Sequence, residues 1–166
     1  MKLLLVSDTH CKNVAQVRQL VDLLRPFARD VEMILHAGDH VIPDVVDALE
    51  ELAPTLAVRG NMDAFGESDR FPKKRVIEVG RFRVGLIHGD GPPKGLIERA
   101  RAPFAGERLD AIVFGHSHSA TVRQVEGVLM VNPGSPLDRR FALENSLGYL
   151  RADAQLTAEI VHLPRR

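Results

Sequence analysis

Short apolar runs alternate with amphipathic stretches from residue 2 to residue 59. The runs 2–7, 31–36 and 55–59 have the length and composition of buried strands. Between them, 13–28 places Val and Leu at spacings of three and four after Asn13, which predicts an N-capped amphipathic helix. The segment 43–53 predicts a second helix, with Pro43 in its first turn. Because this rhythm requires parallel strands joined by right-handed crossovers, we predict an α/β fold.

The second half of the chain is richer in strands. Strands are predicted at 74–79, 81–88 and 110–114, with a helix from Pro92 and Pro93 to about residue 104, and hairpin strands at 120–125, 127–131, 147–152 and 155–162. The polar stretch 60–72 is long for a connection in a compact domain, which is typical of a functional loop. Neither a repeat nor a linker divides the sequence, so residues 1–166 are predicted to form a single domain, a two-sheet sandwich flanked by helices.

Composition excludes several classes of function. Lys plus Arg (22) equals Asp plus Glu (22), so there is no basic excess to bind nucleic acid or an anionic membrane, and Trp is absent. Cys11 is the only cysteine, which excludes an internal disulfide and a cysteine-based zinc site. The apolar start is too short for a signal peptide or a membrane span. We expect a soluble cytoplasmic protein without nucleic-acid or membrane partners, and the sequence leaves a homo-oligomer open.

Polar side chains follow five of the predicted strands. In an open α/β sheet, sites form beyond the carboxyl ends of the strands, and an i, i+2 spacing lets both members of a pair face one pocket. The sequence therefore predicts that seven potential metal ligands converge at one edge: Asp8, His10, Asp39, Asn61, His88, His116 and His118.

Seven ligands are too many for one tetrahedral zinc ion, and they suit two metal ions that share a carboxylate. Mixed imidazole and carboxylate donors favour Mn, Fe, Zn, Ni or Co over Ca or Mg, and we expect manganese first among these. Two metal ions about 3.5–4 Å apart clamp the attacking and leaving oxygens of a phosphoryl displacement. The pattern thus predicts a metal-dependent hydrolase that acts on a small phosphoester substrate.

Five ordered motifs, SDTH, AGDH, RGN, IHG and FGHSH, resemble those of the calcineurin-like metallophosphoesterases. The small size and the stretch Asn132–Ser135 (NPGS) are similar to the single-domain phosphodiesterase branch, and also to a retromer subunit that keeps this fold with a degenerate site. The resemblance implies a four-layer αββα sandwich of two mixed β-sheets flanked by helices. It also implies a binuclear phosphodiesterase in which a metal-bridging hydroxide attacks phosphorus.

The resemblance assigns the candidate ligands to two ions. By matching position, the first ion takes Asp8, His10, Asp39 and His118, and the second takes Asp39, Asn61, His88 and His116. Asp39 is the bridging ligand in this assignment. The residues expected to carry catalysis are Asp39, Asn61, His88 and His116.

Three positions depart from the family pattern. Met62 stands where many family phosphatases have a histidine that protonates the leaving group, so a general acid is not evident. Asp90 stands where relatives often have His, and Cys11 where Gly is usual. Two alternatives to a phosphodiesterase remain open: a phosphomonoesterase of the same fold, and a non-catalytic protein-binding scaffold.

Other polar residues favour structural roles. His36 and His40 are predicted to support the site or to lie on the surface, with His40 as an alternative pocket-lining residue, and His162 is expected on the surface. The Cys11 thiol is expected to pack under its loop rather than act as a nucleophile. The stretch 89–95 (GDGPPKG) resembles a phosphate loop but lacks its spacing, so a turn before a helix is predicted. Arg59, Arg139 and Arg140 are predicted to be solvated charges rather than phosphate clamps.

Overall fold

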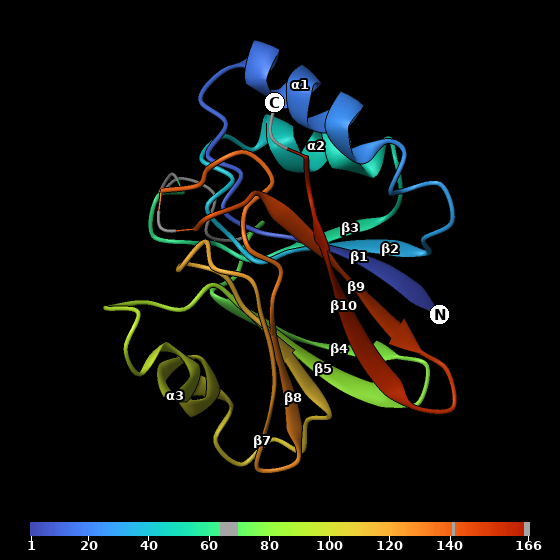
Figure 1. The fold of residues 1–166 in the computed structure, drawn as a ribbon. Coiled ribbons are helices and arrows are strands. Elements are labelled where there is room, and N and C mark those ends of the chain that lie inside the picture. The colour runs from blue at the N-terminus through green and yellow to red at the C-terminus, as the bar shows by residue number, and fades with distance from the viewer. Residues whose placement is uncertain (64–69, 141, 165–166) are drawn as a thin grey trace.

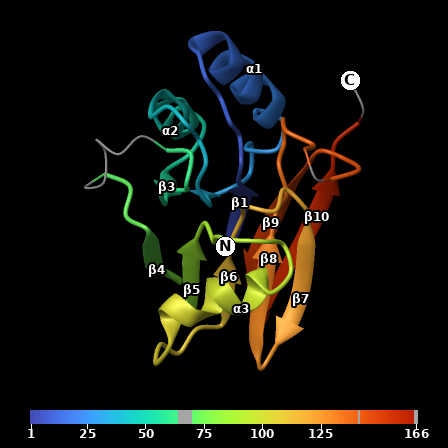
Figure 2. The same ribbon diagram turned by 90° about the vertical axis from the view of Figure 1, so that its left-hand side faces the viewer.

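Two five-stranded sheets pack face to face, with helices on both outer sides, in a computed structural model that describes residues 1–63, 70–140 and 142–164 (Figures 1 and 2). The first sheet has the order β10-β9-β1-β2-β3 and the second the order β4-β5-β6-β8-β7. Each sheet combines parallel and antiparallel pairs. The predicted four-layer αββα sandwich of two mixed sheets is confirmed.

The strands of the first sheet are β1 (Lys2–Val6), β2 (Met33–His36), β3 (Thr55–Ala57), β9 (Ser146–Ala152) and β10 (Leu156–His162). Those of the second are β4 (Lys74–Val79), β5 (Phe82–Ile87), β6 (Ala111–Val113), β7 (Thr121–Val125) and β8 (Val128–Asn132). The helices are α1 (Val14–Leu24), α2 (Asp44–Glu50) and α3 (Leu96–Arg101), the last followed by a 3₁₀ turn at Ala102–Phe104.

Side chains along β1 alternate between two cores, as a strand's period of two requires. Leu4 and Val6 pack under the outer helices, in one cluster with Leu20 of α1. Leu3 and Leu5 point the other way, into the core between the two sheets. All five side chains are fully buried. This central strand is therefore fixed on both faces, which holds the polar segment at its carboxyl end in place.

The outer face of the second sheet is covered by α3. Leu96 and Ala100 of this helix are buried in one cluster with Ile112, Phe114 and Met130. Because β6 and β8 contribute to that cluster, the segments that follow these two strands are anchored from the side of α3 as well as from the inter-sheet core.

The elements are shorter than the sequence predicts, for local reasons. Asn13 caps α1 as expected, its side chain accepting a hydrogen bond from the Gln16 N–H at 3.0 Å, but the helix ends at Leu24 because Pro26 cannot continue it. Pro92 and Pro93 lie in a loop, and α3 begins only at Leu96. Of the predicted functional loop 60–72, residues 64–69 lie outside the described residues.

Among the described residues, no helix is both long and apolar enough to cross a membrane.

Candidate metal centre

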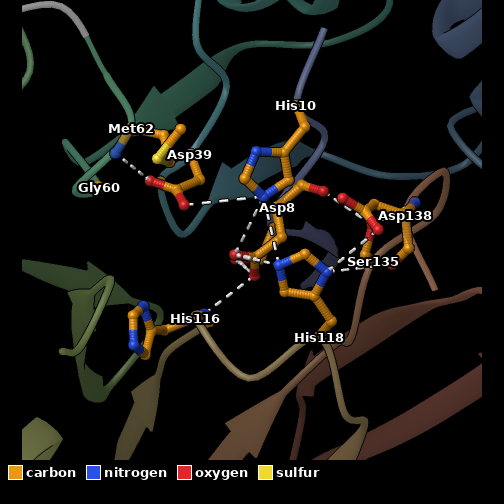
Figure 3. A network of polar contacts seen from close by, with 12 residues as sticks. Asp8, His10, Asp39, Gly60, Met62, His116, His118, Ser135 and Asp138 are labelled. Carbon is orange, nitrogen blue, oxygen red and sulfur yellow. Dashed lines mark hydrogen bonds and ion pairs between the residues drawn. The ribbon is translucent and has the colours of Figure 1, made fainter. Parts of the chain in front are cut away.

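The seven predicted ligands lie together at the edge where β1, β2, β3, β5 and β6 end. Figure 3 shows five of them, Asp8, His10, Asp39, His116 and His118. Polar atoms 3.0 to 3.9 Å apart link each of the seven to at least one other: Asp8, His10, Asp39, Asn61, His88, His116 and His118. They form two groups. We call Asp8, His10 and His118 the first cluster, and Asn61, His88 and His116 the second cluster, with Asp39 between them.

In the first cluster, electron-rich atoms face one another. The Nε2 atoms of His10 and His118 are 3.2 Å apart, and the two rings stack with their centroids 5.0 Å apart. Asp8 Oδ1 lies 3.4 Å from His118 Nε2 and is fully buried without a hydrogen-bond partner among the described residues. A buried carboxylate oxygen without a donor is costly unless a cation meets it. The donor set therefore fits a bound metal ion.

The rest of the Asp8 residue is held firmly. Its Oδ2 accepts hydrogen bonds from the Ser7 hydroxyl at 2.6 Å and from the His116 N–H at 2.9 Å, and its carbonyl accepts one from the Ser135 hydroxyl at 2.7 Å. Gly115 allows the close approach, because a Cβ there would lie 1.8 Å from Ser7 Oγ. Only Oδ1 remains for a metal ion, and its direction is fixed.

The NPGS stretch also orients His118. The Ser135 hydroxyl accepts a hydrogen bond from the Asp138 N–H at 2.8 Å, and the Asp138 carbonyl lies 3.1 Å from Nδ1 of His118. A ring N–H donated to a backbone carbonyl fixes the tautomer of a metal-binding histidine. Nε2 of His118 is thereby left as the acceptor that faces Asp8 and His10. Asp138 is a supporting residue that the sequence did not reveal.

The second cluster repeats this arrangement with backbone support from the residue that follows β2. His88 Nδ1 donates to the carbonyl of Ala37 at 2.7 Å, which leaves Nε2 to face Asn61 Oδ1 at 3.2 Å. Nδ1 of His116 lies 3.0 Å from the same Asn61 oxygen and 3.4 Å from His88 Nε2. Two imidazole nitrogens and an amide oxygen thus converge on one point, which suits a second cation.

Asp39 is placed to serve both clusters. Its Oδ2 lies 3.3 Å from Nε2 of His88 and 3.7 Å from Nε2 of His10, and its Oδ1 accepts a hydrogen bond from the Met62 N–H at 2.8 Å. Gly60 makes room for this carboxylate, since a Cβ there would lie 2.1 Å from Oδ1. Asp8 Oδ1 is also 3.9 Å from His88 Nε2, so Asp8 faces both clusters, whereas the family resemblance gave it to the first ion alone.

Burial and charge shift the pKa values of these groups in opposite directions. Burial acts to lower the pKa of His88, but the hydrogen bond to Asp39 and the charges of Asp8 and Asp39 outweigh it and raise that pKa to about 9. Burial acts to raise the pKa of Asp39, but its contacts with His88 lower it to about 2. Burial is the largest cause for His10 and lowers its pKa. Without metal, the second cluster therefore holds a proton at neutral pH.

Asp63 ties the loops of the site together, although the sequence gave no signal for it beyond an acidic residue after the Gly60 turn. Its buried carboxylate accepts backbone N–H groups from Asp39 at 3.0 Å, Val41 at 2.6 Å and Gly60 at 2.7 Å. His40 Nδ1 lies 3.4 Å from the same carboxylate. One side chain thus fixes the segment that carries Asp39 to the turn that carries Asn61.

Arg99 of α3 is a second residue that the sequence did not reveal. Its guanidinium donates to three backbone carbonyls of the loop before the helix: Asp90 at 2.8 Å, Lys94 at 3.1 Å, and Pro92. Gly91 and Gly95 have left-handed backbone and lie against the guanidinium, where a Cβ would approach it to 3.0 Å. The stretch 89–95 is therefore a loop clamped by an arginine, consistent with the predicted turn.

This loop fixes the tautomer of His116. Nε2 of His116 lies 2.8 Å from the carbonyl of Gly91, so Nε2 carries the proton and Nδ1 is the acceptor that faces Asn61. The chain of contacts runs from Arg99 through the loop backbone to a candidate ligand. The orientation of His116 therefore depends on the side chain of Arg99, which contacts neither cluster directly.

The backbone at the site is unusual. In the described part of the chain, seven non-glycine residues have a positive φ, and five of them are candidate ligands: Asp8, His10, Asp39, His116 and His118. This left-handed conformation costs about 1–3 kcal/mol for each such residue and is concentrated at functional sites. Hydrogen bonds that the Ser7 and Ser135 hydroxyls donate, and one that the Asp63 carboxylate accepts, hold these turns in a geometry that the residues do not favour on their own.

Two histidines outside the clusters support the site from within. His36 is fully buried, with Nε2 3.0 Å from the Thr9 hydroxyl and Nδ1 accepting the Gly38 N–H at 3.1 Å. Burial lowers the pKa of His36 well below its usual value. His40 is buried too, so of the two placements predicted for this pair the structure shows the supporting one.

The remaining singled-out residues have structural settings. Cys11 is fully buried, as expected for a thiol packed under its loop, and burial raises its pKa to about 11. His162 is exposed beside Glu144, at 3.1 Å. Arg139 and Arg140 are exposed, and Arg140 pairs with Asp138 at 2.7 Å. Arg59 is half-buried and borders a recess described below.

Comparisons with known sequences agree with the motifs. The sequence model described as "Calcineurin-like phosphoesterase superfamily domain" matches residues 1–155. A probable metallophosphoesterase of Methanothermobacter thermautotrophicus is 40% identical over 159 residues, which cover 94% of this chain and 89% of that protein. The family match extends over all seven candidate ligands, which lie between residues 8 and 118.

Solved structures agree with the fold. An archaeal phosphodiesterase has a TM-score of 0.75 and 23% identity, with 98% of this chain and 100% of that chain covered. Vps29 of Entamoeba histolytica, solved in complex with Zn²⁺, has a TM-score of 0.71 and 23% identity, with 98% and 99% covered. Together with the sequence matches and the geometry of the two clusters, these findings show that the chain belongs to the calcineurin-like phosphoesterase superfamily, a family of metal-dependent phosphoesterases.

Proposed function

We propose that this chain is a cytoplasmic phosphodiesterase that uses two divalent metal ions, manganese first among them, to hydrolyse a small phosphodiester. The two clusters support two ions, because in each of them imidazole nitrogens and a side-chain oxygen face one another. Asp39, between them, is the bridging carboxylate in this proposal. When bound, two such ions supply an activated water molecule and neutralise the charge that develops on the phosphoryl group.

The observation that carries the choice of a diester is a recess beside each cluster. The larger recess, of 580 Å³, borders Asn61 and His88. The smaller, of 330 Å³, borders His10, together with Thr9 and Asp138. A phosphodiester carries two ester-linked organic groups, whereas a monoester carries one. A centre flanked by two recesses therefore suits the diester better than the monoester.

The protein's own residues position the reaction. The backbone carbonyls of Ala37, Gly91 and Asp138 fix the protons of His88, His116 and His118, so that the opposite nitrogens face the centre. The half-exposed Asn61–His116 side gives a phosphoryl group access from solvent, and His116 is placed to orient it. Met62 carries no transferable proton, so the proposal includes no general acid from this position.

The test is an assay of metal-depleted protein reloaded with Mn²⁺ or Mg²⁺, against bis(p-nitrophenyl) phosphate and p-nitrophenyl phosphate. We expect turnover of the diester to exceed that of the monoester, to be lost in chelator, and to return better with Mn²⁺, since imidazole-rich sites disfavour Mg²⁺. His162→Ala, a surface histidine, serves as the control. Full activity in chelator, with no metal left by elemental analysis, would contradict the proposal. Two bound ions without turnover of any ester would favour the protein-binding scaffold instead.

A further inference from the structure

The larger recess has a charge that the metal centre does not explain. It borders the second cluster at Asn61 and His88, and four cationic side chains line it: Arg59, Lys73, Lys74 and Arg99. Among the lining residues that the structure describes, the acidic ones are Asp63 and Asp90. Four cationic and two acidic residues of the described lining leave an excess of basic residues beside the centre, in a chain whose formal net charge is zero.

Both carboxylates already have partners. Asp63 accepts the three backbone N–H groups described above, and Asp90 Oδ1 lies 3.5 Å from Arg99 Nε. Neither carboxylate makes an ion pair with Lys73 or with Lys74, the first residue of β4. We therefore base the inference below on Lys73 and Lys74.

The two lysines keep donors for a ligand. Lys73 is exposed and makes neither a hydrogen bond nor an ion pair with the described residues. Lys74 donates to the Pro103 carbonyl and lies over the Phe104 ring, 5.1 Å from its centroid. An ammonium group has three N–H donors, so a contact with one carbonyl leaves others unused. Both residues line the recess, so an anion bound there has unused N–H donors within its walls.

The walls of the recess restrict what lies between that anion and the metal centre. Ile87, Pro103 and the aliphatic stems of the basic residues line it, and none of the described lining residues is Phe, Tyr or Trp. Recognition of a nucleobase depends largely on stacking against aromatic side chains. The lining therefore suits a flexible aliphatic chain better than a base.

We infer that the larger recess binds one arm of the phosphodiester, and that this arm is an aliphatic chain that ends in a second anionic group, a phosphate or a carboxylate. The inference rests on the proposed function, because it takes the metal centre as the place where the ester bond is cleaved. It goes beyond that function by naming a class of substrate and the residues, Lys73 and Lys74, that select it.

The experiment compares p-nitrophenyl phosphodiesters that share one leaving group and differ in the other arm: butyl, 3-carboxypropyl and 3-phosphopropyl. We expect kcat/KM to be about tenfold higher for an anionic arm than for butyl, as for one charge-assisted hydrogen bond, and mainly through KM. Added salt should reduce the difference because the amines are near the surface. The carboxylate and phosphate arms show which anion the recess prefers.

Lys73→Met should reduce the preference for an anionic arm, and the double variant Lys73→Met/Lys74→Met should abolish it. Lys94→Met is the matched control, since Lys94 is also exposed but does not line the recess. Lys12→Met probes the smaller recess, which Lys12 borders. Equal kcat/KM for all three arms would overturn the inference. So would a preference that survives in the double variant or disappears in Lys12→Met.

A binding measurement separates this inference from the proposed function. Propane-1,3-diyl bisphosphate and propyl phosphate are titrated into manganese-loaded protein by calorimetry. Tighter binding of the bisphosphate that depends on Lys73 supports the inference even where no diester is turned over, which would count against the proposed function alone. Equal affinity for the two compounds overturns the inference even where diesters are hydrolysed.

Discussion

Two of the three residues of the first cluster are buried, whereas two of the three of the second open to solvent. Asp8 and His118 are 0% and 3% exposed and His10 is half-buried, but Asn61 is exposed and His116 half-buried, with only His88 buried. The first cluster is held by hydrogen bonds to the end of β1 and the NPGS stretch, and the second by the turn at Gly60 and the loop that Arg99 clamps. The first set of ligands is thus supported mainly by buried contacts, and the second mainly by surface loops.

This difference predicts different behaviour for two bound ions. A buried set with fixed ligands binds an ion tightly and releases it slowly, because little of its surroundings moves independently. A set on surface loops depends on each loop contact and exchanges its ion more readily. The following predictions test that contrast, in order of expected effect.

Asp39→Ala should have the largest effect, because it removes the carboxylate that lies nearer than Asp8 to both His10 and His88. Both ions should be lost, and kcat/KM should fall by at least about a thousandfold, which corresponds to several kcal/mol of transition-state stabilisation. Metal content by elemental analysis and diesterase assays measure the two effects.

Single-cluster variants are the controls for Asp39→Ala. His10→Ala should retain an ion in the second cluster, and His88→Ala should retain one in the first. Two bound ions with near-normal turnover in Asp39→Ala would show that its bridging role is wrong.

Met62→His should change the dependence on the leaving group. Met62 is 51% exposed on the side of the second cluster, and its thioether cannot donate a proton. A positioned general acid typically contributes about 10²–10⁴-fold, so wild-type rates should fall steeply as the leaving group's pKa rises. The rate of the Met62→His variant should rise most for substrates with alkyl leaving groups. A series of diesters with graded leaving groups tests this, and a flat wild-type dependence with rate-limiting chemistry would mean that another acid is present.

Arg99→Met should weaken metal binding in the second cluster and leave metal binding in the first cluster unchanged. The loop carbonyl that fixes His116 would lose its clamp, and loss of such outer contacts typically costs about 10–100-fold in metal affinity. Arg101→Met is the matched control, because Arg101 lies on the same helix and makes a surface ion pair with Glu126 at 2.6 Å. Metal titrations that show equal losses for both ions, or for both variants, would argue against a positioning role.

Metal binding should release about one proton from the second cluster at pH 7.5, since the pKa of His88 is raised to about 9. The folded pKa lies above the unfolded value of 6.5, so the stabilisation from protonated His88 is fully present below pH 6.5 and is lost as pH rises through 9. The Tm of metal-free protein should fall over that interval, and less so in His88→Gln. Calorimetry in buffers of different ionisation enthalpy counts the proton, and equal heats in all buffers would contradict this.

The sequence reveals the ligands because each follows a strand and each pair has a fixed spacing. The apolar alternation along β1 predicts its two buried faces, and strand-end positions place Asp8, Asp39 and His88 at one edge. These are local patterns, so they are visible in a single chain. The family motifs then add the order in which the ligands recur.

The supporting residues were not predictable, because their roles depend on contacts between distant segments. Asp63 and Arg99 have no distinctive sequence neighbours, yet one accepts three backbone N–H groups and the other donates to three carbonyls. Asp8 facing both clusters is likewise a matter of side-chain direction, which spacing along a strand does not determine. The surface or buried position of His36 was left open for the same reason.

The left-handed backbone at five candidate ligands has a consequence for how quickly a metal ion enters. Asp8 and His118 are nearly inaccessible, so an ion that approaches from the recess beside His10 meets these two ligands only when the turns that carry them move. Because those turns already hold conformations that cost about 1–3 kcal/mol each, opening them releases strain and should need less activation than opening an ordinary buried loop. Loading of the first cluster should then proceed at a rate set by the protein, which stays constant as the metal concentration is raised in stopped-flow mixing. A rate that rises in proportion to metal concentration over the whole range would mean that the site is open before the ion arrives.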